Sequence, residues 1–255
     1  MPPLRCSRSV ELLIETLAEI PSTNGALLAR LGGGEHVPEG YWLVADRQSA
    51  GRGRAGRVWS DGFGNFMGST VVHLRAHDPL PQTLALVAGL AAHESVMALV
   101  PQFQDLRLKW PNDLLVGEAK LAGILLERQG EAVVVGIGVN LAQAPEVADR
   151  ATASLAGLGF AVERDAFAAE LAARFRDAVD RWHYGEWPLL RQQWVARALP
   201  TGTLVSVKDR EQGTIIGAFA GIDDDGVALL RLADGAVRAI HAGDIDMVGS
   251  HAFGG

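Results

Sequence analysis

The chain of 255 residues is long enough for one large domain, or for a large domain with a small one beside it. Its composition, 48% hydrophobic and 21% charged residues, is that of a globular protein with a sizeable core, and its one cysteine excludes a disulfide framework or a cysteine metal site. The net charge of −7 argues against a general nucleic-acid binder, because such proteins usually carry a basic face.

The start of the chain does not have the pattern of a signal peptide. Glu11, Glu15 and Glu19 interrupt the apolar residues that lead to Ile20. No stretch of the sequence approaches the roughly 18 uninterrupted apolar residues that a membrane span needs. We therefore expect a cytoplasmic protein with no membrane partner.

Along the first part of the chain, apolar spacing and turn residues predict a mixture of strands and helices. Residues 10–20 could form a strand or a short helix, and Ser22 or Thr23 can cap a helix from about residue 25 to residue 31. Strands are expected at residues 41–45, 66–74, 106–110, 121–127 and 132–139. Helices are expected at residues 81–99, 164–183 and 187–199.

The connections between the three strands from 106 to 139 are short. Short connections favour an antiparallel meander over parallel strands with crossover helices. Asn112 and Asp113 follow Pro111 and are expected to form a turn between two of these strands.

After Pro200 the pattern changes to short strands separated by Asp-Gly turns. The expected strands are at residues 204–207, 213–220, 227–232 and 237–240. This spacing is typical of a small β-barrel or sandwich. We therefore expect two domains, residues 1–199 and residues 200–255.

Glycine-rich and polar segments fall at the points where strands end or turn. The most unusual is the glycine/arginine loop, Gly51 to Arg57, whose amides and guanidinium groups suit a carboxylate or a phosphate. On its own this loop could equally be a flexible basic surface segment or an RNA-binding one. Similar segments are Ser22–Thr23–Asn24, Gln48, Lys109 to Asp113, Lys120 to Leu125, and Asn140. Polar groups at the ends of strands in one sheet can converge on one pocket.

In their order and spacing these segments resemble the biotin protein ligase family. The matching motifs are STN, GRGRAGR after a glutamine-bearing strand, KWPND followed by KLAGIL, and GIGVN at a strand end. The resemblance covers nearly the whole chain, and it implies an α+β fold. In that fold a mixed, mostly antiparallel sheet with helices forms a class II synthetase-like ligase core, and a small SH3-like β-barrel follows it.

The resemblance also implies a two-step reaction. Biotin and ATP would give biotinyl-5′-AMP and pyrophosphate, and biotin would then pass to one lysine of a biotin carboxyl carrier domain, such as that of acetyl-CoA carboxylase or a related carboxylase. The reaction would use Mg²⁺ with ATP.

Residue roles follow from the same resemblance. The catalytic residues would be Lys120, Arg54 and Asp113. The biotin-binding residues would be Ser22, Thr23, Asn24, Gln48, Gly51, Arg52, Gly53, Arg54 and Lys120. The residues that bind ATP or the adenylate would be Arg52, Arg54, Arg57, Trp59, Lys109, Asn112, Lys120 and Asn140. The candidate metal ligands would be Asn112 and Asp113.

The sequence departs from the family pattern at two places. Pro21 stands where many relatives carry an acidic residue, and residues 149–158 lack the tryptophan that some bacterial relatives fold over the adenine. About twenty residues precede Pro21, too few for the helix-turn-helix module of the repressor-type members. We therefore expect a monofunctional ligase that binds no specific DNA, and whether it forms a homodimer stays open.

Two other functions remain open on the sequence alone. A lipoate or octanoate ligase or transferase would share the fold, although KWPND together with GRGR is the biotin-type pattern. An RNA-binding module would need stacking aromatic residues and a basic face, whereas aromatic residues make up 6% of this acidic chain.

Overall fold

The computed structural model describes residues 13–60, 62–147, 150–209 and 213–248. Its larger part contains a seven-stranded mixed sheet in the order β1-β2-β3-β7-β6-β5-β4. The strands are β1 (Leu13–Ile20), β2 (Tyr41–Gln48), β3 (Phe66–His73), β4 (Leu106–Lys109), β5 (Asp113–Val116), β6 (Ala119–Gln129) and β7 (Ala132–Val139). β1 and β2 pair in parallel, and the other neighbouring strands pair antiparallel. The predictions of a mixed, mostly antiparallel sheet and of an antiparallel meander from residue 106 to residue 139 are confirmed.

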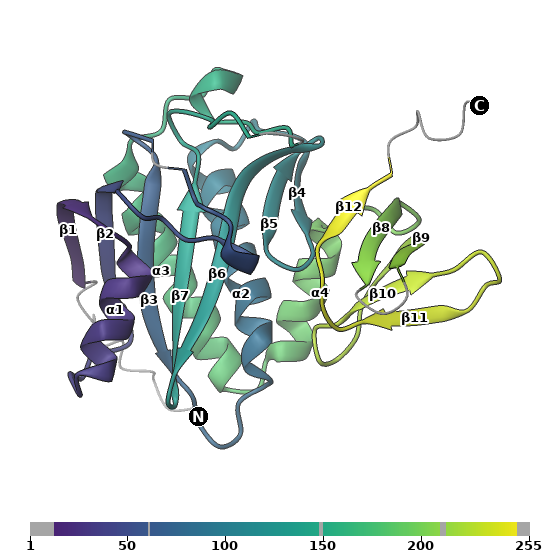
Figure 1. Ribbon diagram of the computed structural model, residues 1–255, viewed down its shortest axis with the longest axis horizontal. Helices are drawn as coiled ribbons and strands as arrows, with labels where there is room; N and C mark the ends of the chain where they lie inside the picture. The colour runs from purple at the N-terminus through teal and green to yellow at the C-terminus, as the bar shows by residue number, and fades with distance from the viewer. Residues whose placement is uncertain (1–12, 61, 148–149, 210–212, 249–255) are drawn as a thin grey trace, which may run out of the picture.

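Helices cover both faces of this sheet. They are α1 (Thr23–Gly32), α2 (Leu84–Leu99), α3 (Arg164–His183) and α4 (Trp187–Arg197). In Figure 1, α1 lies in front of the sheet and α2 and α3 lie behind it. The predicted cap is confirmed, because the Ser22 hydroxyl accepts a hydrogen bond from the Gly25 amide at 3.3 Å.

The side chains of β7, the central strand, point alternately to the two faces of the sheet and so belong to two separate cores. Val133 and Val135 pack into the larger core with α2 and α3, whereas Val134 packs into the smaller core with α1. Gly136 and Gly138 continue the α1 face of β7 but carry no side chain. This end of the α1 face is therefore left free for other groups.

α2 is a buried core helix. By length and composition the segment Pro81–Leu99 is apolar enough to cross a membrane, yet 67% of that window is buried inside the protein. Its side chains belong to the larger core, between the sheet and α3. The prediction of a buried helix from its apolar sequence is confirmed.

The C-terminal part is a five-stranded antiparallel sheet in the order β11-β10-β9-β8-β12. Its strands are β8 (Leu204–Asp209), β9 (Gly213–Ile222), β10 (Ala228–Arg231), β11 (Val237–Ile240) and β12 (Ile245–Met247). The prediction of a small unit of short strands after Pro200 is confirmed, and its described strands are hydrogen-bonded in the linear order given above. β12 was missed because three residues are too few for a clear alternation.

Hydrogen bonds fix the C-terminal sheet against the larger part. The Trp110 indole donates to the Gly226 carbonyl at 2.9 Å, and the Trp187 indole donates to the Asp224 carbonyl at 2.6 Å. The Lys109 ammonium donates to the Ile245 carbonyl at 2.8 Å. The small sheet is thus held at the turn between β9 and β10 and again at β12.

Two differences from the sequence prediction have local causes, and one alternative that the sequence left open is resolved. Asp113 begins β5, where only a turn was expected, because β5 is four residues long and both Leu114 and Leu115 are buried, so it shows no alternation. β2 runs on to Gln48 since β1 pairs with it over that length. For residues 10–20 the sequence left a strand or a short helix open, and the structure has a strand from Leu13 to Ile20. Residues 10–12 lie outside the described residues.

Candidate active site

A cavity of about 660 Å³ lies on the α1 face of the sheet, between the start of α1, the glycine/arginine loop, β6, β7 and the C-terminal sheet. Six basic and three acidic side chains line it. They are Arg52, Arg54, Arg57, Lys120, Arg150 and Lys208, with Asp113, Asp244 and Asp246. A protein of net charge −7 therefore concentrates positive charge at this cavity, which suits an anionic ligand.

One end of the cavity carries a buried polar network of Ser22, Thr23, Asn24, Gln48 and Ser69. The Thr23 amide donates to Gln48 Oε1 at 2.8 Å, and the hydroxyls of Thr23 and Ser69 lie 2.7 Å apart. The Ser69 hydroxyl donates in turn to Asn24 Oδ1 at 2.6 Å. These five residues offer hydroxyls and carboxamides at a helix N-terminus, so they suit a neutral ring with several hydrogen-bonding groups. At the edge of the network the Asn24 side-chain amide donates to Glu127 at 2.9 Å.

Two glycines of the GIGVN motif, Gly136 and Gly138, leave space on β7 for side chains that line the cavity. A Cβ on Gly136 would lie 2.2 Å from Asn24 Oδ1, and a Cβ on Gly138 would lie 2.4 Å from the Trp59 indole ring. No real Cβ makes such contacts, so a larger residue at either position would force Asn24 or the Trp59 ring to move. The motif thus lets a helix side chain and a loop side chain approach the central strand closely.

Two polar atoms along the cavity are buried and have no hydrogen-bond partner among the described residues, the Trp59 indole nitrogen and Asn140 Oδ1. The side-chain nitrogen Nδ2 of Asn140 donates to the Ala153 carbonyl at 3.1 Å, so the side chain is fixed with its oxygen unpaired. A buried unpaired polar atom costs about 1–3 kcal/mol. A ligand with a donor group would remove this cost at Asn140.

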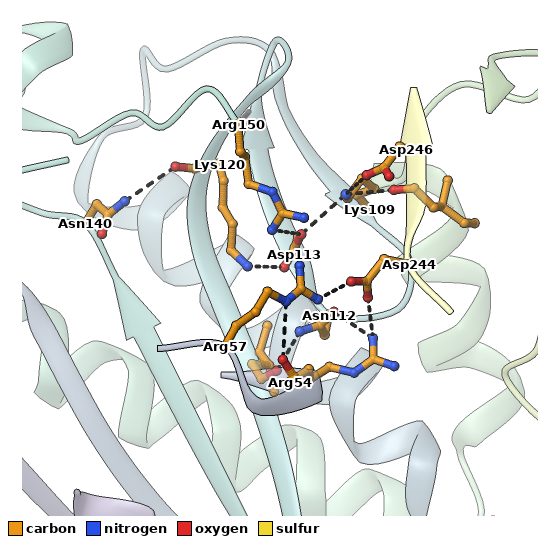
Figure 2. A network of polar contacts seen from close by, with 12 residues as sticks. Arg54, Arg57, Lys109, Asn112, Asp113, Lys120, Asn140, Arg150, Asp244 and Asp246 are labelled. Atoms are coloured by element: carbon orange, nitrogen blue, oxygen red, sulfur yellow. Dashed lines mark hydrogen bonds and ion pairs between the residues drawn. The ribbon is translucent and has the colours of Figure 1, made fainter. Parts of the chain in front are cut away.

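The other end of the cavity carries a cation cluster, Lys109, Lys120 and Arg150 around Asp113 (Figure 2). Asp113 Oδ1 lies 2.5 Å from Lys120 Nζ, and Oδ2 lies 3.4 Å from Lys109 Nζ and 3.9 Å from Arg150 Nη1. Asp113 and the more exposed Asp246, whose carboxylate lies 3.9 Å from Lys109 Nζ, still leave one of the three cations unbalanced. This end therefore suits an additional anion.

The cluster shifts the pKa of both groups at its centre. Burial raises the pKa of Asp113, but the positive charges of Lys120, Lys109 and Arg150 lower it by more than burial raises it. The pKa of Asp113 is therefore below its usual value. Burial lowers the pKa of Lys120, and Asp113 opposes this lowering without cancelling it. Asp113 is thus the group that favours the charged form of Lys120.

The glycine/arginine loop reaches the cavity through its arginines. Arg54 Nη1 donates to Asn112 Oδ1 at 3.0 Å and to Asp244 Oδ1 at 3.1 Å, and Arg57 also pairs with Asp244. Arg52 pairs with Glu127 of β6 at 3.1 Å. These contacts join the loop to the β4–β5 connection, to β6 and to the C-terminal sheet.

The structure brings most of the residues singled out in the sequence to the cavity wall. Those that line it are Ser22, Thr23, Asn24, Gln48, Arg52, Gly53, Arg54, Arg57, Trp59, Asn112, Asp113, Lys120 and Asn140. Gly51 lies behind the wall, where its carbonyl accepts from the Trp59 amide at 3.0 Å and closes the base of the loop. Lys109 is buried between Asp113 and the Ile245 carbonyl.

Sequence reasoning missed four charged residues of the wall, Arg150, Lys208, Asp244 and Asp246. They belong to no motif, and they reach the cavity through pairings between distant parts of the chain. The short strand β12 places Asp246 within 3.9 Å of Lys109. The pairing of β8 with β12 brings Lys208, Asp244 and Asp246 together, and Arg150 is placed separately by the pairing of residues 151–153 with β6.

Asn112 and Asp113 do not fit a directly bound Mg²⁺. Asn112 Oδ1 accepts from Arg54, and its amide nitrogen donates to the Ile124 carbonyl at 2.7 Å. Asp113 is already surrounded by the cation cluster, which would repel a metal ion. Within the part of the chain that the structure describes, no group of three or more His, Cys, Asp or Glu side chains could hold a metal.

Comparison with known proteins gives a consistent picture. Residues 18–142 match the model of the Biotin/lipoate A/B protein ligase family, and residues 202–248 match the Biotin protein ligase C terminal domain. The chain is 37% identical over 238 residues to the biotin–[acetyl-CoA-carboxylase] ligase of Mycobacterium tuberculosis, covering 91% of this chain and 88% of the relative. It is 38% identical over 231 residues to the enzyme of that name from Paracoccus denitrificans, covering 84% and 92%.

Among solved structures, the fold matches biotin protein ligase from Aquifex aeolicus in complex with biotin and ATP. The TM-score is 0.81 at 27% sequence identity, over 93% of this chain and 99% of that one. The match therefore includes both the larger part and the C-terminal sheet.

Proposed function

The chain belongs to the biotin protein ligase family, and from this premise we propose how its cavity activates biotin with ATP and transfers it to a carrier lysine. The carrier is a biotin carboxyl carrier domain of acetyl-CoA carboxylase. The observation that carries the proposal is the polarity of the cavity, with the neutral polar network at one end and the cation cluster at the other. Biotin has the same polarity, a ureido ring at one end and a carboxylate at the other.

In the first step, a carboxylate oxygen of biotin attacks the α-phosphorus of ATP. A C–O–P bond forms, the bond from the α-phosphorus to the bridging oxygen breaks, and pyrophosphate leaves with that electron pair. Negative charge builds up where carboxylate and phosphate meet, and we assign its stabilisation to Lys120, Arg52 and Arg54. Asn140 Oδ1 would accept a hydrogen bond from the adenine amine, and Trp59 would pack against the adenylate.

In the second step, the neutral amine of the carrier lysine attacks the acyl carbon. An amide bond forms, AMP leaves with the electron pair of the broken C–O bond, and the amine releases a proton. We assign Asp113 the roles of holding Lys120 and orienting the incoming amine. Lys109 would support Asp113 from behind the wall rather than touch ATP.

The further parts of the proposal concern domains, metal and partners. We propose that residues 1–199 form the catalytic domain and residues 200–255 a β-domain, which completes the site with Asp244 and Lys208. Mg²⁺ would arrive as the counterion of ATP, and no step depends on a protein ligand to it. The protein would act in the cytoplasm, and these 255 residues, with their net charge of −7, would bind no specific DNA.

Native mass spectrometry tests the reaction directly. After incubation with biotin, ATP and MgCl₂, the protein should retain a mass equal to biotinyl-5′-AMP, and a purified carrier domain added next should gain one biotinyl group. Octanoate in place of biotin is the matched control. An octanoyl adduct without a biotinyl one would favour a lipoate-type ligase and would contradict the proposal.

Arg54→Ala should make the enzyme release its intermediate. Arg54 joins the glycine/arginine loop to Asn112 and Asp244, so its loss should open the cover over the adenylate. Losing a charged hydrogen bond costs about 1.5–3 kcal/mol, so we expect about tenfold to 100-fold more biotinylation of a non-carrier protein such as albumin. Arg128→Ala, on the exposed end of β6, is the control, and equal albumin labelling by both variants would contradict a covering role.

A further inference from the structure

Arg150 is a basic residue that no sequence motif identified, yet it lies at the reaction centre. It lines the cavity, and its side chain is 27% exposed. In Figure 2 it approaches Asp113 from above, while Arg54 and Arg57 lie below. Arg150 therefore reaches the carboxylate from the side opposite to the arginines of the glycine/arginine loop.

Backbone pairing fixes the position of Arg150 relative to Lys120. The Lys120 amide donates to the Ala151 carbonyl at 2.9 Å, and the Ala153 amide donates to the Lys120 carbonyl at 2.9 Å. Lys120 and Thr152 therefore form a parallel bridge, and residues 151–153 run beside the start of β6. The two side chains are held at the same end of the cavity by one short piece of sheet.

The charges around Asp113 indicate what Arg150 is available for. Lys120 lies within hydrogen-bonding distance of Asp113, and Lys109 has the Ile245 carbonyl as a second partner. Arg150 is the most distant of the three, and 3.9 Å is too long for a hydrogen bond. A guanidinium offers a planar fork of donors that matches two phosphate oxygens.

We propose that Arg150 binds the β- and γ-phosphates of ATP and stabilises the pyrophosphate as it leaves. This inference rests on the proposed function. In the first step the electron pair of the broken P–O bond moves onto the bridging oxygen of pyrophosphate, and Arg150 is placed to neutralise that charge. In the second step the leaving group is AMP, so Arg150 has no role there.

The two half-reactions therefore separate the effects of Arg150→Ala. In pyrophosphate release from biotin and ATP, the KM for ATP should rise by about tenfold to 100-fold. In the reverse reaction, ATP formation from biotinyl-5′-AMP, the KM for pyrophosphate should rise by a similar factor. Transfer from supplied biotinyl-5′-AMP to the carrier domain should stay within about twofold of wild type. Arg150→Lys should recover part of the loss, because it keeps the charge without the fork.

Arg128→Ala is again the matched control and should change none of these values. Equal losses in both half-reactions of Arg150→Ala would mean that Arg150 only supports Asp113, and the proposal would be wrong. An unchanged KM for pyrophosphate would also overturn it. A wild-type protein that formed no biotinyl-5′-AMP would contradict the proposed function itself. An active wild type with an Arg150→Ala variant of equal KM for ATP and pyrophosphate would contradict only the role of Arg150.

Discussion

Lys120→Ala is expected to abolish adenylate formation while leaving the fold nearly intact. The Lys120 ammonium lies 2.5 Å from Asp113 at the end of the cavity where we propose that carboxylate and phosphate meet. Removing a group that stabilises developing charge typically costs about 10²- to 10³-fold in rate. The fold should survive because Asp113 keeps Lys109 and Arg150 as partners.

Pyrophosphate release with saturating biotin and ATP measures this effect. Arg128→Ala changes an exposed residue of the same strand and should retain wild-type activity. Unlike Arg150→Ala, the Lys120 variant should also lose transfer from supplied biotinyl-5′-AMP. Activity within about threefold of wild type would remove Lys120 from the mechanism.

Asp113→Asn is expected to lower both stability and activity. Without the carboxylate, Lys109 stays buried with its charge poorly balanced, and breaking a buried ion pair from one side typically costs about 3–5 kcal/mol. The folded pKa of Asp113 is below its usual value, so its stabilising contribution is present above about pH 4 and is lost as pH falls further. The free energy of unfolding measured in urea should therefore be lower for the variant than for wild type at pH 7, and the difference should be smaller below pH 4.

The same variant should shift the pH profile of adenylation. Asp113 opposes the lowering of the Lys120 pKa by burial, so its neutralisation lowers that pKa further. Lys120 then loses its proton at a lower pH, and the fall in rate at alkaline pH should begin earlier. Asp105→Asn is the control, because it changes an exposed carboxylate. Its free energy of unfolding should stay within about 0.5 kcal/mol of wild type, and its pH profile of adenylation should be unchanged. An unshifted alkaline limb in Asp113→Asn would contradict the coupling.

The sequence predicted those parts of the fold whose signals are local. The apolar spacing of α3, the cap at Ser22 and the β-branched run of β7 each depend on a few neighbouring residues, and all three are confirmed. β5 was missed because it follows a proline turn and its first three residues are buried without alternation. A length of four gives too few residues to distinguish a strand from a loop.

The KWPND motif shows how far the site could be predicted. The sequence indicated a turn at Pro111, but the structure makes it the connection of a tight hairpin in which Lys109 pairs directly with Asp113. The motif therefore brings two opposite charges together across two strands. Arg150 and Asp244 could not be predicted in this way, because their positions depend on pairings between segments far apart in the chain.

The docking of the C-terminal sheet limits how the two parts could be exchanged in evolution or engineering. Trp110 and Lys109 belong to the same hairpin as Asp113, and both donate hydrogen bonds to carbonyls of the small sheet. Both acceptors are backbone carbonyls, so a sheet taken from another protein satisfies the buried indole and the buried ammonium only where its backbone presents carbonyls at the same two positions. The C-terminal sheet can therefore be exchanged only for one whose β9–β10 turn and β12 dock in the same way on the hairpin that holds Asp113.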